Sequence, residues 1–431
     1  MYLPPLSAED EYISSWEYRR SLIKDRVGRV DADIVCLQEV SPLTFEDDFE
    51  FMTEHLGYDG VELFHKGRFR PATFWKKSRV ELVGPAQHKD RTLLTTFRLL
   101  DTDTTRPNES VSSENWHVLN CHLQAGKQGG RRVRQIVEGV SAAYKLAKKL
   151  KEKDPANLNL IVCGDFNGGE ESGAVHYLEK GSVGPDFIED GESVSSKEKC
   201  LPLPSPLMDV VLTDEVEWMN GCPPPTLVVP ELISLIIDQG KIETCYINPQ
   251  FSADTLDRFQ RIYERFASVP SDGKSMQMGK LDVERWLTAI NGRVGRGSEF
   301  RSAAKSMGWV EPSSELEGSG RESNKRESTT YKSTERSRIK IPEEGILSLE
   351  DFVGVYLEEL RQGKFWGIAW DLATLGEPLP VENVFTERYD RMYCSKSLFP
   401  AAVLHFHCKN PCPNKSEPSD HLPIAASFTR L

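Results

Sequence analysis

Three short, almost continuously apolar runs in this chain each end in a polar cluster. The runs occupy residues 33–36, 116–119 and 159–163, and their β-branched composition is typical of buried strands. The clusters that follow are Leu37-Gln38-Glu39, Asn120-Cys121-His122-Leu123 and Gly164-Asp165-Phe166-Asn167, and a fourth, Ser419-Asp420-His421-Leu422-Pro423, lies near the end. Because buried strands can direct polar ends to a single point on the rim of a sheet, we expect the clusters to form one site.

Two of these clusters carry carboxylates that suit a divalent metal. Magnesium prefers hard oxygen ligands and usually takes one or two protein carboxylates, which leaves room for water and a substrate phosphate. Glu39 and Asp165 supply such ligands. Asp165 is also the better candidate for the general base toward the attacking water, and Asn167 can hold that water. These residues predict metal-assisted hydrolysis of a phosphate ester.

The two histidine clusters suit the phosphate itself. His122 and His421 can donate hydrogen bonds to non-bridging phosphate oxygens and so stabilise the charge that builds during in-line displacement. Asp420 directly precedes His421 and can fix the tautomer and orientation of its ring. Taken alone, each group has a simpler explanation, since a Glu or His beside an apolar run is usually structural. Four clusters in one chain, in this order, favour the catalytic interpretation.

Longer stretches around the clusters resemble a known family. The matching stretches are residues 16–20, 32–40, 120–125, 163–167, 172–178, 385–393 and 418–424. They are similar to the endonuclease/exonuclease/phosphatase superfamily with its DNase I-like fold, and within it to the deadenylase branch that includes nocturnin-like and angel-like proteins. The resemblance covers about residues 12–225 and 380–431, and it implies an α/β fold: a four-layer α/β sandwich of two sheets flanked by helices.

The resemblance also implies a role for each cluster. By this likeness Glu39 is the ligand of magnesium or manganese, and Asp165 and Asn167 act on the water. His122 and His421 hold the phosphate, and Asp420 supports His421.

Two departures from the family affect the expected site. The family begins with a strand whose Asn helps the acidic ligand bind metal, and nothing before Glu39 supplies that Asn. We therefore expect either an upstream segment that brings this strand or a protein that does without it. Near the other end, Arg391-Met392 stands where the family has Tyr-Ile, and we assign the preceding Asp390 as a contact to the substrate.

The charge of the chain bears on its partners. The formal net charge of −13 argues against a general nucleic-acid coating protein, because phosphate binding draws on clustered Lys and Arg. Local clusters of Lys and Arg can still bind phosphate. Basic residues follow His122 at the start of an amphipathic helix that we predict over residues 131–153. Arg131 and Arg134 are the candidates for guiding a nucleotide phosphate, although a solvated helix start explains either of them equally well.

The composition is that of an ordinary globular protein, with 39% hydrophobic and 28% charged residues. No apolar stretch approaches the length that a membrane span needs, and no charged-then-apolar leader opens the chain, so we expect no membrane partner. Cys36, Cys121 and Cys163 fall inside predicted strands and are typical of reduced core residues in the cytoplasm or nucleus. A zinc site within residues 405–412 is the less favoured alternative, because its spacing is not that of a zinc finger.

Between residues 226 and 379 the pattern becomes helical. Apolar positions predict a helix, a turn and a second helix, twice over, which resembles a pair of EF-hands. With Gly279 as the sixth position of the first loop, Arg285 falls at the twelfth and almost no calcium ligands remain; with Gly345 as the sixth position of the second, Glu344 and Asp351 remain. We therefore favour packing or contact with a protein partner over calcium binding. Residues 312–340 have almost no large apolar side chains and are expected to be disordered.

The sequence thus predicts a catalytic domain in two parts, residues 1–225 and 380–431, around an EF-hand-like insert at 226–379. The predicted function is a magnesium-dependent phosphodiesterase, a deadenylase-like 3′–5′ exoribonuclease acting on RNA 3′ ends. Two alternatives stay open. One is a nucleotide or dinucleotide phosphatase of the same fold, and the other is a non-catalytic scaffold with an impaired metal site whose insert binds a partner.

Overall fold

The computed structural model shows two compact units, which are described separately. One comprises residues 4–230 and 383–431, and the other residues 231–382. The structure describes residues 4, 7–63, 69–100, 114–152, 154, 157–189, 191–194, 202–212, 223–238, 240, 248–269, 276–294, 298–307 and 345–431. The segment 312–340, which was expected to be disordered, lies outside these ranges. No helix in the described ranges is long and apolar enough to cross a membrane.

The first unit is built on a seven-stranded sheet in the order β11-β14-β8-β7-β6-β4, with β5 paired to β6. Its strands are β4 (Val80–Leu82), β5 (Gln87–Lys89), β6 (Thr92–Leu99), β7 (Asn115–His122), β8 (Asn159–Asp165), β11 (Met208–Asp209) and β14 (Asp390–Cys394). β7 and β8 run parallel and the other pairs are antiparallel. The parallel pair is buried on both faces, which explains why these strands are almost continuously apolar.

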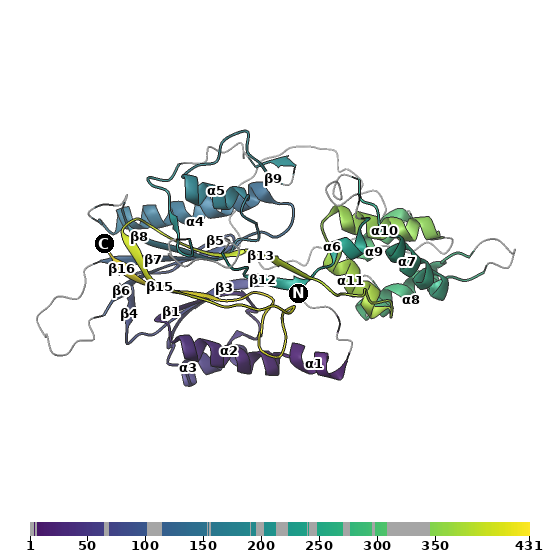
Figure 1. The fold of residues 1–431 in the computed structure, drawn as a ribbon, viewed down its shortest axis with the longest axis horizontal. Coiled ribbons are helices and arrows are strands. Elements are labelled where there is room, and N and C mark those ends of the chain that lie inside the picture. The colour runs from purple at the N-terminus through teal and green to yellow at the C-terminus, as the bar shows by residue number, and fades with distance from the viewer. Residues whose placement is uncertain are drawn as a thin grey trace, which may run out of the picture. The chain divides into compact units, whose positions relative to one another are not determined.

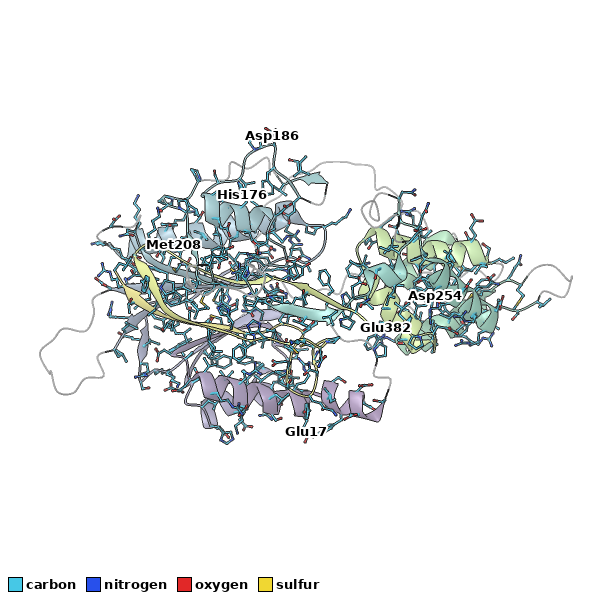
Figure 2. The ribbon with its side chains drawn as sticks, in the orientation of Figure 1. Glu17, His176, Asp186, Met208, Asp254 and Glu382 are labelled. Carbon is cyan, nitrogen blue, oxygen red and sulfur yellow. The ribbon has the colours of Figure 1, made fainter. Side chains whose placement is uncertain are left out.

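A second sheet faces the first and contains β1 (Ile34–Val40), β3 (Arg70–Trp75) and β2 (Gly60–Leu63), in that order and antiparallel. Helices α4 (Gly129–Lys149) and α5 (Gly173–Lys180) cover the outer face of the larger sheet. Helices α1 (Ala8–Ser14), α2 (Trp16–Val30) and α3 (Phe45–Glu54) lie along the other side of the unit (Figure 1). His176 on α5 and Glu17 on α2 mark the two outer helical layers in Figure 2. The predicted α/β sandwich is confirmed.

Three two-stranded sheets complete this unit. They are β9 (Ile188–Glu189) with β10 (Glu192–Ser193), β12 (Leu227–Pro230) with β13 (Val384–Glu387), and β15 (Leu398–His405) with β16 (Ile424–Arg430). Of these, β12 matters most for the site, because Leu227 at its start forms an antiparallel bridge with His421.

Apolar side chains fill the spaces between the layers. Leu119, Ile136 and Leu160 belong to the core between the larger sheet and its helices. Trp75, Phe97 and Cys163 fill the space between the two sheets, where Cys36 packs against them. Cys36, Cys121 and Cys163 are free thiols, as the sequence predicted; Cys36 and Cys163 lie between the two sheets, and Cys121 lies between the larger sheet and its helices.

The second unit is helical. It contains α6 (Ile233–Ile236), α7 (Ala253–Phe266), α8 (Lys280–Asn291), α9 (Ser298–Ser306), α10 (Leu349–Arg361) and α11 (Phe365–Thr374). Its core is aromatic: Phe259 stacks on Tyr356 with ring centroids 4.4 Å apart, and Trp286 meets Phe352 edge-on at 5.1 Å. Such contacts stabilise a small unit beyond the effect of area burial.

Backbone hydrogen bonds pair the two predicted EF-hand-like loops. This pairing changes the loop position to which Gly279 is assigned in the first loop. Met278 and Leu347 exchange hydrogen bonds immediately before Gly279 and Ser348, the N-caps of α8 and α10. If Gly345 is the sixth loop position, Ser348 is the ninth. Gly279, its counterpart, is then also the ninth rather than the sixth. The twelfth position of the first loop therefore falls on Asp282 and not on Arg285.

Both twelfth-position carboxylates cap their own helices. Asp351 Oδ2 accepts hydrogen bonds from Ser348 N at 3.3 Å and Ser348 Oγ at 2.7 Å. Asp282 Oδ2 accepts from Gly279 N at 3.0 Å, and Asp282 Oδ1 lies 2.6 Å from Arg285 Nη2. Glu344, the other proposed calcium ligand, lies outside the described residues. A calcium ion at Asp351 would have to compete with the capping interactions, and the EF-hand assignment stays a proposal.

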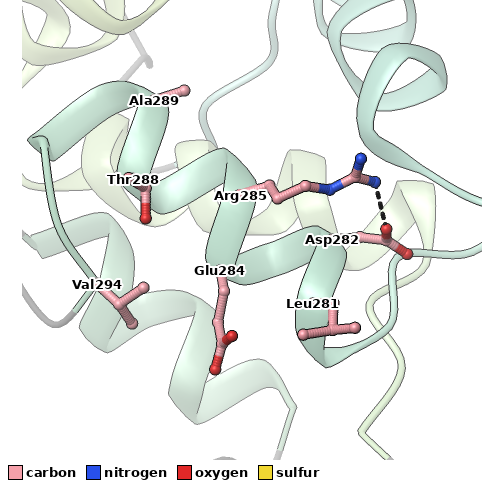
Figure 3. Close-up of a pocket in the computed structure, with 7 residues that line it drawn as sticks. All are labelled: Leu281, Asp282, Glu284, Arg285, Thr288, Ala289 and Val294. Carbon is pink, nitrogen blue, oxygen red and sulfur yellow. Dashed lines mark hydrogen bonds and ion pairs between the residues drawn. The ribbon is translucent and has the colours of Figure 1, made fainter.

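A shallow pocket opens beside α8 in the helical unit (Figure 3). Its lining residues are Leu281, Asp282, Glu284, Arg285, Thr288, Ala289 and Val294. The pocket contains none of the residues predicted to act on a phosphate, so the candidate active site has to be sought in the sandwich.

Candidate active site

Three strands of the larger sheet place three polar side chains in one row. His122 and Asp165 are the last residues of the parallel strands β7 and β8, and they stand opposite each other in the register. β14 runs antiparallel to β8 and begins at Asp390, which stands opposite Asp165. Parallel strands that end together bring their carboxyl-terminal residues to the same edge, and an antiparallel neighbour brings its first residue there. The row is therefore fixed by the sheet itself.

His421 enters this row from the loop before β16. Its backbone is held by Leu227 of β12 and by Ser419 Oγ, which accepts from His421 N at 3.2 Å. Its Nδ1 lies 2.6 Å from Asp390 Oδ2, a short charge-assisted contact. Ligand atoms of Asp165, Asp390 and His421 all lie within 4.8 Å of one another. Nδ1 is thus committed to Asp390, and Nε2 is the nitrogen available to a substrate.

Glu39 reaches the site from the second sheet. The pairing of β1 with β3 is interrupted between Leu37 and Val40, and Glu39 in this bulge has a φ of +57°. Bulges and left-handed conformations of this kind re-aim side chains near active sites. The Glu39 side chain is 64% exposed, and its Oε1 lies 3.7 Å from His122 Nε2. The same nitrogen lies 3.7 Å from Asp165 Oδ2, so His122 stands between two carboxylates.

A fully buried amide connects the two sheets beneath Glu39. Asn120 Nδ2 donates to Leu37 O at 3.2 Å and Ala72 O at 2.9 Å, and its Oδ1 accepts from Gln38 Nε2 at 2.8 Å. Asn120 thereby fixes the two residues that precede Glu39. No functional role was predicted for Asn120 from the sequence. A signal was present, because Asn120 and His122 are two residues apart on one strand and so point to the same face.

Asn167 holds Asp165 in place. Asn167 N lies 2.8 Å from Asp165 Oδ1, and Asn167 Nδ2 donates to Asp165 Oδ2 at 2.7 Å and to Leu123 O at 3.1 Å. Its amide N–H groups are therefore engaged, and its Oδ1 is the atom suited to orienting a water. Gly164 before the pair has a φ of +127°, and a Cβ there would lie 2.1 Å from Cys121 O, so only glycine fits.

The burial and charges of the site displace the pKa values of its groups. Burial raises the pKa of Asp165 to about 7, with Asp390 and Glu39 acting in the same direction. Burial opposes protonation of His421, but Asp390 and the neighbouring carboxylates outweigh it and raise the pKa of this imidazole well above its ordinary value. Burial lowers the pKa of His122, whose Nδ1 lies 3.3 Å from Phe69 O. Neutral His122 therefore carries its proton on Nδ1, and its Nε2 donates to a phosphate only in the imidazolium form.

The donor set fits a divalent cation. With all groups ionised, the carboxylates of Glu39, Asp165 and Asp390 outnumber the His421 imidazolium by two charges. Close carboxylates repel one another, which is part of the reason for the raised pKa of Asp165. Oxygen ligands of this kind suit magnesium or manganese. Glu39 and Asp165 would hold the ion.

Asp390 and Asp420 have different surroundings from those expected. Asp390 was assigned to the substrate, but its carboxylate contacts His421 Nδ1. Asp390 therefore occupies the place expected of Asp420, the partner that fixes the His421 tautomer. Asp420 Oδ1 lies 3.5 Å from Ser419 Oγ, and its carbonyl accepts from Val228 N at 3.1 Å.

The two arginine candidates also separate. Arg131 Nη2 lies 3.4 Å from Asp90 Oδ2, next to the turn that precedes β6. Arg134 Nε lies 4.0 Å from Glu138 Oε1, one turn along the exposed side of α4. Arg131 thus pairs with the turn that precedes β6, while Arg134 pairs within its own helix.

The N-terminal helices hold the loop that carries His421. Tyr18 Oη donates to Lys415 O at 2.8 Å, and Arg19 Nε to Pro418 O at 2.5 Å. Arg26 pairs with Glu417 at 3.0 Å and covers the Phe406 ring at 4.2 Å. The contacts of Tyr18 and Arg19 give residues 16–20 a positioning role that their sequence did not disclose.

The zinc alternative finds no support at residues 405–412. The group of metal-capable side chains within the described ranges is Asp165, Asp390 and His421. Cys408 and Cys412 instead face the Asn414 amide, whose Nδ2 lies 3.3 and 3.5 Å from the two sulfur atoms.

Known proteins resemble this chain over most of the sandwich. The sequence profile of the Endonuclease/Exonuclease/phosphatase family matches residues 9–421. The 2′,5′-phosphodiesterase 12 of Rattus norvegicus is 26% identical over 293 residues, which are 61% of this chain and 45% of the relative. The CCR4-Not complex 3′-5′-exoribonuclease subunit Ccr4 of Schizosaccharomyces pombe is 27% identical over 215 residues, 39% of this chain and 31% of the relative.

Among solved structures, the chain is similar to ANGEL2, a 2′,3′-cyclic phosphatase, in complex with adenosine-2′,3′-vanadate. The identity is 15%, the TM-score 0.43, and the match covers 97% of this chain and 87% of the other. The chain spans less than half the length of the curated relatives described above. The family profile covers the first three polar clusters and extends to His421 in the fourth. The chain belongs to the Endonuclease/Exonuclease/phosphatase family.

Proposed function

We propose that this protein is a metal-dependent phosphodiesterase that hydrolyses RNA from its 3′ end, with magnesium or manganese as the metal. One observation carries the proposal: Glu39, His122, Asp165, Asn167, Asp390 and His421 come from five separate segments and meet at one rim of the sandwich. A structural role explains any one of these groups, but it does not explain an excess of carboxylates around two histidines.

The roles of the residues follow from their contacts. Asp165 accepts a proton from the attacking water, whose position is set by Asn167 Oδ1. His421 is charged through its pairing with Asp390, and it presents Nε2 to a non-bridging phosphate oxygen. The metal, when bound by Glu39 and Asp165, supplies Lewis-acid stabilisation of the phosphate charge. Both kinds of stabilisation act on charge that is greatest in the transition state.

The substrate class rests on the relatives. One is named as a 2′,5′-phosphodiesterase and another as a 3′-5′-exoribonuclease, so both linkages belong in the test. The experiment is a turnover panel of polyadenylated RNA, 2′,5′-linked oligoadenylate and NADP with magnesium, with products separated by length. Stepwise shortening of an oligonucleotide supports the proposal. Release of phosphate from NADP alone would favour the nucleotide phosphatase, and no turnover of any substrate would favour the scaffold.

A further inference from the structure

Three arginines gather at a tight turn beside the catalytic groups. The turn joins β5 to β6, and Asp90 in it has a φ of +40°. Arg70 Nη1 donates to Asp90 O at 2.9 Å, and Arg131 Nη2 lies 3.4 Å from Asp90 Oδ2. Arg91 is the next residue of the turn. The Asp90 carboxylate is further occupied by Gln135 Nε2 at 2.7 Å. Arg70, Arg91 and Arg131 are called the arginine cluster below.

The arginine cluster adjoins the active site through the backbone. Arg91 O accepts a hydrogen bond from His122 N at 3.0 Å, so the turn and the catalytic histidine are directly connected. The described part of the chain gives the Arg91 guanidinium no hydrogen bond or ion pair. Burial lowers the pKa of Arg91 and the charges of Arg131 and Arg70 lower it further, while the carboxylates of Asp90 and Glu39 act in the opposite direction. Three mutually repelling cations in one place are stabilised by a bound anion.

The start of α4 adds to the positive potential. Arg131 lies in its first turn, which contains no acidic residue, and its N-cap Gln128 makes no side-chain capping bond. A helix of 21 residues carries a partial positive charge at its N-terminal end.

An exposed aromatic residue directly precedes Arg70 in the chain. Phe69 precedes Arg70, has a φ of +54° and is 54% exposed. Its carbonyl oxygen contacts His122 Nδ1 at 3.3 Å, which ties its backbone to the active site as well. The exposed ring offers a face on which a base can stack, and the arginines offer cations for a phosphate; proteins bind single-stranded nucleic acid through these two features.

We propose that the arginine cluster and Phe69 form a second nucleotide subsite, which binds the phosphate and base adjacent to the scissile linkage. The guanidinium groups bind the second phosphate in a bidentate manner, and Phe69 stacks on a base. The ligand class is an oligonucleotide with at least two phosphodiester links, rather than a nucleotide with one phosphate. This inference rests on the proposed function, because it takes the first phosphate to lie at His421 and Asp165.

The test compares an oligonucleotide with a diester that has no second phosphate. The variants are Arg91→Gln, Arg131→Gln and Phe69→Leu, and the substrates are oligoadenylate and bis(p-nitrophenyl) phosphate. Arg79→Gln is the matched control, because Arg79 pairs with Asp33 at 3.1 Å just before β1, at the opposite end of that strand from Glu39. It removes the same charge without touching the arginine cluster.

We expect each arginine variant to lower the ratio of kcat/KM for oligoadenylate to that for the small diester by about tenfold or more, mainly through KM. The slope of log KM against log salt concentration should fall by roughly 0.7 per arginine removed. Phe69→Leu should lower the ratio without changing the salt slope. Arg79→Gln should leave both unchanged. Equal losses on the two substrates, or variants that match Arg79→Gln, would overturn the subsite.

A binding measurement separates this inference from the proposed function. Fluorescein-labelled oligoadenylate is titrated with each protein in EDTA, where no hydrolysis takes place, and anisotropy is recorded. Weaker binding by Arg91→Gln than by Arg79→Gln supports the subsite even if the parent protein hydrolyses nothing, a result that would count against the proposed function alone. Equal binding by the two variants refutes the subsite even if the parent is an active phosphodiesterase.

Discussion

Replacing Asn120 by alanine should damage both the stability of the sandwich and its metal site. Asn120 is fully buried on β7, and its amide bridges to Leu37, Gln38 and Ala72 in the opposite sheet. The variant leaves two carbonyl oxygens and one side-chain amide without this partner. The carbonyl oxygens keep other bonding capacity, so the cost lies toward the lower end of the range for unsatisfied buried groups. We expect a loss of about 2–4 kcal/mol in the free energy of unfolding.

The functional effect has a separate cause. Gln38 and Leu37 directly precede Glu39, and without the Asn120 bonds the bulge that aims the Glu39 carboxylate is no longer fixed. Residues that orient a metal ligand typically contribute about 10–100-fold to metal affinity or activity. We therefore expect the magnesium concentration for half-maximal activity to rise by roughly that factor.

Urea denaturation followed by circular dichroism measures the first effect, and a magnesium titration of activity measures the second. Asn115→Ala is the matched control, because Asn115 lies at the other end of β7 and donates one bond, to Glu152 Oε1 at 3.0 Å. It should lose about 1 kcal/mol and keep the parent magnesium dependence. Two results would contradict this prediction. One is an Asn120→Ala variant that is no less stable than Asn115→Ala, and the other is a variant that loses stability but reaches half-maximal activity at the same magnesium concentration as the parent.

Three further predictions concern the catalytic groups and the insert. Asp390→Asn should lower kcat by roughly a hundredfold or more, because an amide does not hold the charged His421 tautomer, while Asp420→Asn should cost less; equal losses would contradict the assigned pairing. In EDTA, the carboxyl of Asp165 stays protonated up to about pH 7 in the folded protein but only to about pH 4 when unfolded, so its contribution to stability falls as pH rises through this window. The melting temperature of Asp165→Asn relative to the parent in EDTA should therefore be higher at pH 8 than at pH 5; a difference that does not increase with pH refutes the buried charge. Calorimetry at micromolar calcium should show no tight site in the insert, because Asp282 and Asp351 cap helices, and two tight sites would contradict this.

Much of the sandwich could be predicted because the apolar pattern that identifies each strand lies within the sequence of that strand. A continuous apolar run indicates a buried strand, and Glu39, His122 and Asp165 each follow such a run in the sequence. The parallel register of β7 and β8 then aligns two of them without further information.

The contacts that depend on pairing between distant segments could not be predicted in this way. The bond between Asp390 and His421 follows from the register of β14 against β8, and nothing in the sequence around Asp390 reveals that register. The role of Asn120 likewise depends on how one sheet faces the other. In the insert, Gly279 fits two loop positions equally well, and only the pairing of Met278 with Leu347 chooses between them.

The most direct test of the central claim is a magnesium titration of oligoadenylate hydrolysis by the parent, Asp165→Asn and Glu39→Gln, with both 3′,5′- and 2′,5′-linked substrates. Circular dichroism first establishes that all three proteins are folded. We expect EDTA to abolish hydrolysis by the parent, magnesium to restore it, and each variant to be slower by orders of magnitude at saturating magnesium. Hydrolysis that persists in EDTA, or a folded Asp165→Asn variant that turns over at the parent rate, would contradict it.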